Sequence, residues 1–205
     1  MQSADYERIK KAIGDVYEEN ADFLNNIPID IFGLAHRMGF RLIKASDKLK
    51  SGIKKVKEFQ ELNKEKDIYG YTFFDENKME YVIYYDDVNA GLNKQRFSVA
   101  HEIGHIVLGH VDNGVENSEK AEREANYFAG YLLCPDCLST NEEIYQTLSE
   151  DFYCISMWFG LADDAAMIQY KHHSTRNSLP SNRCYEYERI IMDCLEEAVL
   201  KKIRD

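Results

Sequence analysis

The amino-acid sequence predicts an α+β fold in which a small β-sheet precedes two helices and a helical C-terminal lobe follows them. Two segments rich in aromatic and β-branched residues, 69–74 and 79–85, are joined by a polar turn and read as a strand hairpin. Behind them, apolar residues recur at helical spacing from about residue 92 and again over 118–133. After residue 137 the patterns are helical, apart from a polar break over 174–182.

Length and charge limit the classes of protein to consider. With 205 residues, the chain fits one domain with a small appended lobe, and we expect a core over 1–137 and a helical lobe over 138–205 packed on it. A formal net charge of -11 opposes nonspecific attraction to phosphate backbones, so direct binding of nucleic acid is not expected. No run approaches the roughly 18 apolar residues of a membrane span, and the N-terminus lacks a signal-peptide pattern. We therefore expect a cytoplasmic protein with no membrane contact, in which the five cysteines are reduced thiols.

The N-terminal region is predicted to be helical before the sheet begins. Apolar spacing indicates a helix over 3–23 and a second over 27–39, with Pro28 near its first turn and Gly39 at its end. A strand is predicted over 40–45. Segment 41–66 carries nine basic residues against four acidic ones, which fits either a solvated face or a docking surface for an acidic partner.

The segment His101-Glu102-Ile103-Gly104-His105 carries the chemistry of the chain. On a helix the two histidines lie one turn apart, so both imidazoles can reach one metal ion, and the Glu102 carboxylate beside them can take a proton from water. The competing interpretation is a buried amphipathic helix that happens to carry two histidines. A third ligand decides between them, because zinc hydrolases use three protein ligands and an open fourth position. The metzincin arrangement is excluded, since Leu108 and Val111 occupy the places of its glycine and third histidine.

The helix predicted over 118–133 offers Glu119, Glu122 and Glu124 as candidates for the third ligand. Its apolar stripe is centred near Ala125, and Glu122 lies about 60° from that centre, whereas Glu124 lies about 100° away. Glu122 is therefore the carboxylate expected to point inward, and Glu124 is expected to face solvent. Asn126, one turn beyond Glu122, is a candidate for orienting a histidine ligand.

These motifs together resemble the ImmA/IrrE family of metallo-endopeptidases. The resemblance rests on three stretches: RFSVAHEIGH over 96–105, the glutamate of 122 followed by Ala125, Asn126, Phe128 and Ala129, and LLCP over 132–135. It is densest from residue 81 to 135 and implies a zincin-like domain. Carried over by position, it implies zinc (Zn2+) on His101, His105 and Glu122, a gluzincin-like set, with Glu102 as general base and later proton shuttle.

The resemblance further implies that the substrate is a regulatory protein, of the helix-turn-helix repressor class. Two other functions remain open on the sequence. One is a zinc-containing module that captures such a regulator without cutting it, and the other is a metal-dependent hydrolase of a small molecule.

The C-terminal lobe leaves further alternatives. Helices are predicted over 141–150, 154–172 and 183–204. We expect Trp158, Phe159, Leu161 and Ile168 to pack against the core, and the last helix has a broad apolar face for the domain or for a partner. His172-His173 is read as a surface helix end rather than a ligand pair. Cys134-x-x-Cys137 is weak evidence for a second metal or for redox chemistry. The oligomeric state is not predicted.

Overall fold

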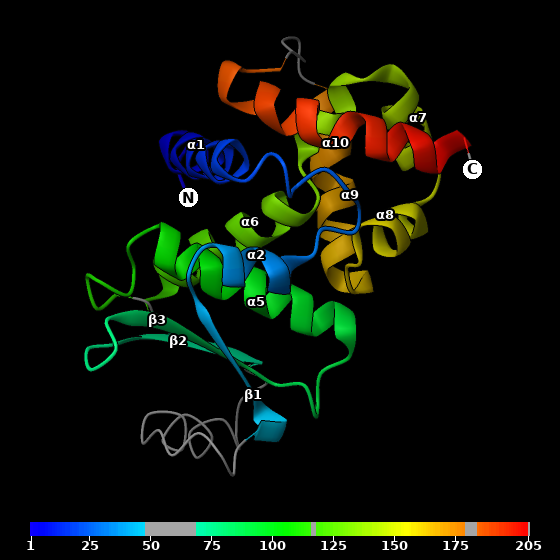
Figure 1. Ribbon diagram of the computed structural model, residues 1–205. Coiled ribbons are helices and arrows are strands. Elements are labelled where there is room, and N and C mark those ends of the chain that lie inside the picture. Colours follow the sequence, from blue (N-terminus) through cyan, green and yellow to red (C-terminus); the bar gives the residue numbers. More distant parts are fainter. Residues whose placement is uncertain (48–68, 116–117, 179–183, 205) are drawn as a thin grey trace. The chain divides into compact units, whose positions relative to one another are not determined.

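The computed structural model describes residues 1–47, 69–115, 118–178 and 184–204 (Figure 1). By their internal contacts these residues form two compact units, one of Ile31–Ala125 and one of Met1–Asp30 together with Asn126–Asp205. The predicted division between residues 137 and 138 stays a prediction. Most of the basic segment 41–66 lies outside the described residues. Its role as a docking surface therefore also stays a prediction.

The unit of residues 31–125 contains a mixed three-stranded sheet. Strands β2 (Gly70–Asp75) and β3 (Glu80–Tyr85) pair antiparallel, which confirms the predicted hairpin. Strand β1 (Arg41–Lys44) pairs parallel with β3, so the order is β1-β3-β2 and β3 is central. The α+β prediction is thus confirmed at the level of a helix-rich fold with one small sheet.

Alternate side chains of the central strand β3 point to opposite faces of this sheet. Val82 and Tyr84 join an apolar cluster with Ile43 and Phe73. Tyr85, which points to the opposite face, contacts Phe32 of helix α2 with ring centroids 5.3 Å apart.

Within the described part of this unit, two α-helices and a short 3-10 helix precede α6. Helix α2 (Ile31–Arg37) starts later than predicted, so Pro28 precedes it instead of occupying its first turn. A short 3-10 helix, η1 (Ala45–Asp47), follows β1. Helix α5 (Leu92–Val107) packs on β2, β3 and α2 and runs along the sheet in Figure 1. The α5 position matches the prediction because its buried residues Val99 and Ile103 recur at helical spacing.

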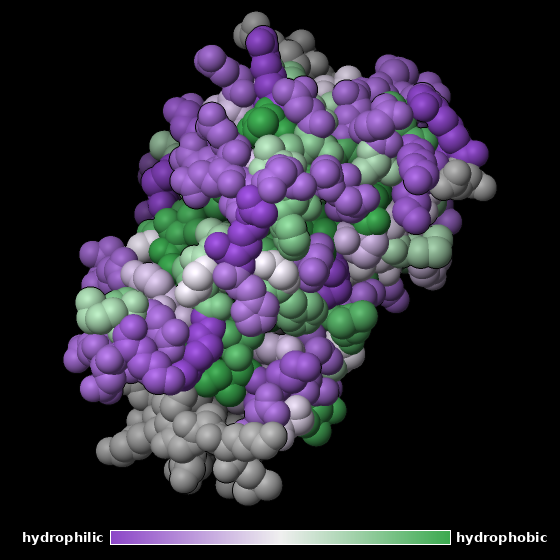
Figure 2. All heavy atoms as spheres, in the orientation of Figure 1, coloured by the Kyte–Doolittle hydropathy of each residue, from purple (hydrophilic) through white to green (hydrophobic). Residues whose placement is uncertain are grey.

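The other unit joins the two ends of the chain. Helix α1 (Ser3–Glu19) packs on α10 (Glu186–Arg204), and a Cβ on Gly14 would lie 2.6 Å from the Tyr187 carbonyl oxygen. The apolar face predicted for the last helix therefore docks within the chain, with Ile191, Leu195 and Val199 fully buried. On the side visible in Figure 2, α10 carries mainly hydrophilic residues.

Among the described residues, this unit also contains the end of helix α6 (Glu119–Leu133), the 3-10 helix η3 (Asp136–Thr140) and three α-helices. Those helices are α7 (Glu142–Glu150), α8 (Phe152–Phe159) and α9 (Asp163–Asn177). The single helix predicted over 154–172 was wrong, because Gly160 adopts a left-handed conformation with φ 63° and ends α8. Phe159 and Leu161 are buried as predicted, but Ile168 is 52% exposed.

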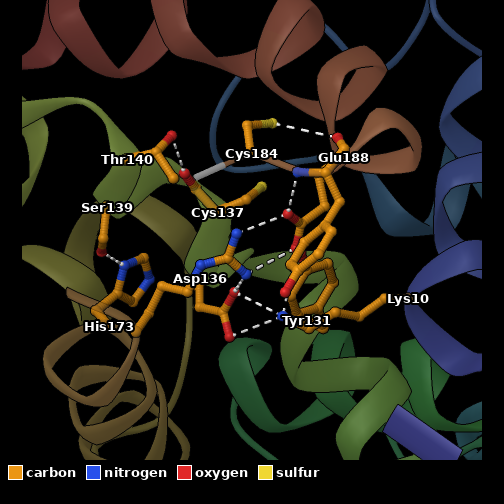
Figure 3. A network of polar contacts seen from close by, with 11 residues as sticks. Lys10, Tyr131, Asp136, Cys137, Ser139, Thr140, His173, Cys184 and Glu188 are labelled. Carbon is orange, nitrogen blue, oxygen red and sulfur yellow. Dashed lines mark hydrogen bonds and ion pairs between the residues drawn. The ribbon is translucent and has the colours of Figure 1, made fainter. Parts of the chain in front are cut away.

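A buried network of charges links α1, α6, η3, α9 and α10 (Figure 3). Glu188 is fully buried and accepts hydrogen bonds from Arg176 at 2.8 and 2.7 Å and from the Tyr131 hydroxyl at 2.7 Å. Lys10 donates to Asp136 at 2.9 Å. Burial alone would raise the pKa of Glu188, but the Arg176 guanidinium and the Lys10 ammonium lower it to about 2.

His173, Cys134 and Cys137 are part of the interior of this unit. His173 is 2% exposed, with Nδ1 2.5 Å from the Ser139 hydroxyl, so its prediction as a surface helix end was wrong. Burial lowers its pKa to about 4. Cys134 and Cys137 are buried free thiols, and burial raises the pKa of both. Among the described helices none is long and apolar enough to cross a membrane.

Candidate metal centre

Helix α5 brings His101 and His105 together. Their Nε2 atoms lie 3.0 Å apart because residues four apart on a helix share one face. The His105 side chain is 3% exposed and that of His101 is 14% exposed, so the pair lies at the edge of the buried surface of α5.

Helix α6 adds Glu122 to this pair. Its first turn is capped by Ser118, whose hydroxyl accepts the Ala121 N–H at 3.2 Å. The Glu122 carboxylate then lies 3.3 Å from Nε2 of His101 and 3.7 Å from Nε2 of His105. Two imidazole nitrogens and one carboxylate oxygen thus fall within 4.8 Å of one another, and the Glu122 side chain is 46% exposed, which leaves this side of the group open to solvent.

The surroundings hold these side chains in the forms that bind a cation. Burial, reinforced by the neighbouring His101, lowers the pKa of His105 to about 3, so its imidazole is neutral at pH 7. The hydrogen bond with His101 lowers the pKa of Glu122, so that group is a carboxylate. Two imidazoles and one carboxylate suit zinc, and three protein ligands leave one tetrahedral position open. The residues present therefore fit the metal that the sequence predicts.

Glu102 lies beside this group and packs against the sheet. It is 6% exposed, and a Cβ added at Gly70 on β2 would lie 2.9 Å from its Oε1 and 3.1 Å from its Cγ. A side chain at position 70 would therefore push this carboxylate out of its observed place. The role of Gly70 is not among the sequence-based predictions, although a glycine at the start of a strand is a known sign of close approach.

His110 and Glu124 extend the site behind His105. His110 Nδ1 lies 3.2 Å from His105 Nδ1, and its Nε2 lies 3.0 Å from Glu124 Oε2. Both residues are buried, His110 at 5% and Glu124 at 3% exposure. The prediction that Glu124 faces solvent was wrong, because angular distance from an apolar stripe does not reveal that a histidine covers that flank.

Asn126, predicted to orient a histidine ligand, is exposed one turn after Glu122 on α6. It belongs to the unit of residues 126–205, and its role stays a prediction.

The comparison with known families agrees with this geometry. Residues 55–148, slightly under half of the chain, match the peptidase M78 family, described as the IrrE N-terminal-like domain. Residues 55–148 are thus similar to an IrrE N-terminal-like domain. The resemblance to the ImmA/IrrE family is thereby confirmed, and this family implies a metallopeptidase-type function. No curated protein matches the chain.

The residues matched to the IrrE N-terminal-like domain include strands β2 and β3, helices α5 and α6, and the whole His101, His105 and Glu122 group.

Proposed function

We propose that this chain is a zinc-dependent endopeptidase with a zincin-like domain, in which His101, His105 and Glu122 hold the metal. The observation that carries the proposal is the convergence of these three side chains on one point, with Glu102 next to His101 on the same helix. A zinc ion bound there supplies Lewis acidity, which acidifies water and polarises a peptide carbonyl.

Glu102 is proposed to move the proton. Its carboxylate would accept a proton from the attacking water and later deliver it to the amine of the departing peptide. Burial against β2 restricts the carboxylate to one place, which general acid–base catalysis requires because the proton must cross a single hydrogen bond. The exposed side of Glu122 leaves room for a substrate to approach.

The proposed substrate is a regulatory protein of the helix-turn-helix repressor class. This step rests on the resemblance to the ImmA/IrrE family. The charge of -11 supports recognition of a protein over direct recognition of DNA, and it fits a partner whose DNA-binding surface is basic.

The test is to incubate the protein with helix-turn-helix regulators encoded beside its gene and to follow zinc-dependent cleavage by mass spectrometry. Glu102→Gln should keep zinc and fold but abolish cleavage, because the amide cannot accept the proton. Glu119→Gln is the matched control, since this side chain is 86% exposed and should leave the rate unchanged. Cleavage by Glu102→Gln at the wild-type rate would show that the mechanism is wrong. A zinc-loaded wild type that binds a regulator without cutting it would favour the capture module instead.

A further inference from the structure

We propose that His110 and Glu124 are positioning residues that fix the tautomer of His105 and so aim its Nε2 lone pair at the metal. The proposal rests on the zinc site proposed above and concerns how the chain holds one of its ligands.

The C-terminal end of helix α5 places His110 next to His105. Gly109 adopts a left-handed conformation with φ 73°, and its N–H donates to the Ile106 carbonyl at 2.9 Å. The next N–H, of His110, donates to the His105 carbonyl at 2.9 Å. These two bonds form a Schellman motif, whose geometry brings the second residue past the C-cap back against the third-last residue of the helix. Here those residues are His110 and His105, so the motif stacks one imidazole beside the other, with centroids 5.1 Å apart.

Hydrogen-bond chemistry then determines where the protons lie. An ionised carboxylate only accepts, so the contact of 3.0 Å between His110 and Glu124 requires a proton on Nε2 of His110. The Nδ1 of a neutral His110 is then an acceptor, and the contact of 3.2 Å requires a proton on Nδ1 of His105. Nε2 of His105 is left with its lone pair, and this is the atom that faces His101 and Glu122.

The position of Glu124 supports this order of donors. Its carboxylate is 4% exposed, and the Lys120 ammonium lies 3.5 Å from its other oxygen, which places a positive charge beside the acceptor. Helix α6 therefore contributes twice to the centre, with Glu122 on the metal side and Glu124 behind the histidine. Ligating histidines in metalloproteins commonly donate their second nitrogen to such a partner, and losing it costs about 10- to 100-fold in metal affinity.

The first experiment reads the tautomer directly. Long-range 1H–15N spectra of the metal-free, histidine-labelled full chain distinguish protonated from bare ring nitrogens. The wild type should show His105 protonated on Nδ1. His110→Phe keeps an aromatic ring but removes the acceptor, so His105 should move toward protonation on Nε2. Glu124→Gln, whose amide can accept or donate, should give a mixture of the two forms.

The second experiment measures zinc affinity by competition with a chelating indicator. His110→Phe should weaken binding by about 10- to 100-fold, and Glu124→Gln should weaken it less. The matched controls are His36→Phe, at an exposed position of α2, and Glu119→Gln, and both should bind zinc as the wild type does.

Unchanged His105 protonation together with unchanged zinc affinity in both His110→Phe and Glu124→Gln would overturn the inference. A wild type that binds no zinc would overturn the proposed function instead. The tautomer measurement remains informative in that case, because it uses the metal-free chain.

Discussion

Replacing Gly70 with alanine tests how closely the sheet holds Glu102. The new methyl carbon would lie 2.9 Å from the Glu102 Oε1, whereas ordinary contact begins at 3.4 Å. Because Cγ of the same side chain would be 3.1 Å away, the whole carboxylate end must withdraw instead of rotating in place. To restore ordinary contact at 3.4 Å, Oε1 must move away from the methyl carbon by about 0.5 Å.

The expected effect is on catalysis and not on the metal. A misplacement of 1 Å near reacting atoms can cost about 100-fold in rate, so half of that distance corresponds to a loss of about tenfold, or ~1.4 kcal/mol of transition-state stabilisation. Glu102 is not among the proposed ligands, so zinc content should stay at the wild-type level. An alanine also suits a strand better than glycine does, so the free energy of unfolding should change little.

The assay is the initial rate of zinc-dependent cleavage of the cognate regulator, or of a quenched fluorescent peptide library, at equal zinc loading. Gly91→Ala is the control, because Gly91 has ordinary φ of -62° and no atom within 4 Å of an added Cβ. A Gly70→Ala enzyme with wild-type kcat and KM would refute the reasoning that this contact positions Glu102.

Three further predictions follow from the same structure. Glu122→Ala should lower zinc occupancy measured by elemental analysis, and an unchanged metal content would remove Glu122 from the site. The pKa of Glu188 is lowered to about 2, so the ionised group contributes about 3 kcal/mol to the free energy of unfolding. This contribution should be complete above pH 4.5 and lost toward pH 2. Chemical denaturation at several pH values should show the difference in free energy of unfolding between wild type and Glu188→Gln shrinking as pH falls. Cys134 and Cys137 should resist thiol reagents until the chain unfolds, because burial raises their pKa and hides them; mass-spectrometric detection of either one modified in the native protein would contradict this.

Local patterns in the sequence were sufficient for most elements. The hairpin of β2 and β3 and the helix α5 were predicted close to their observed bounds, because strand alternation and helical periodicity act over neighbouring residues. The same locality applies to His101 and His105, whose convergence needs only one turn of helix. Gly160 could also have been recognised as a helix end, since glycine is the usual residue in that left-handed position.

Tertiary packing decided the features that depend on residues distant in the chain. The parallel pairing of β1 with β3, the docking of α10 on α1 and the contact of Gly70 with Glu102 each join segments that no short pattern connects.

The metal centre shows the same division. The sequence by itself determined the histidine pair, its neighbouring glutamate and a ligand candidate on the next helix, because helix geometry is local and identical everywhere. Only the folded chain decided that His110 returns to His105 and that Glu124 is buried behind it. The physical reason is that burial of a side chain depends on what covers it, and here the cover comes from the end of another helix.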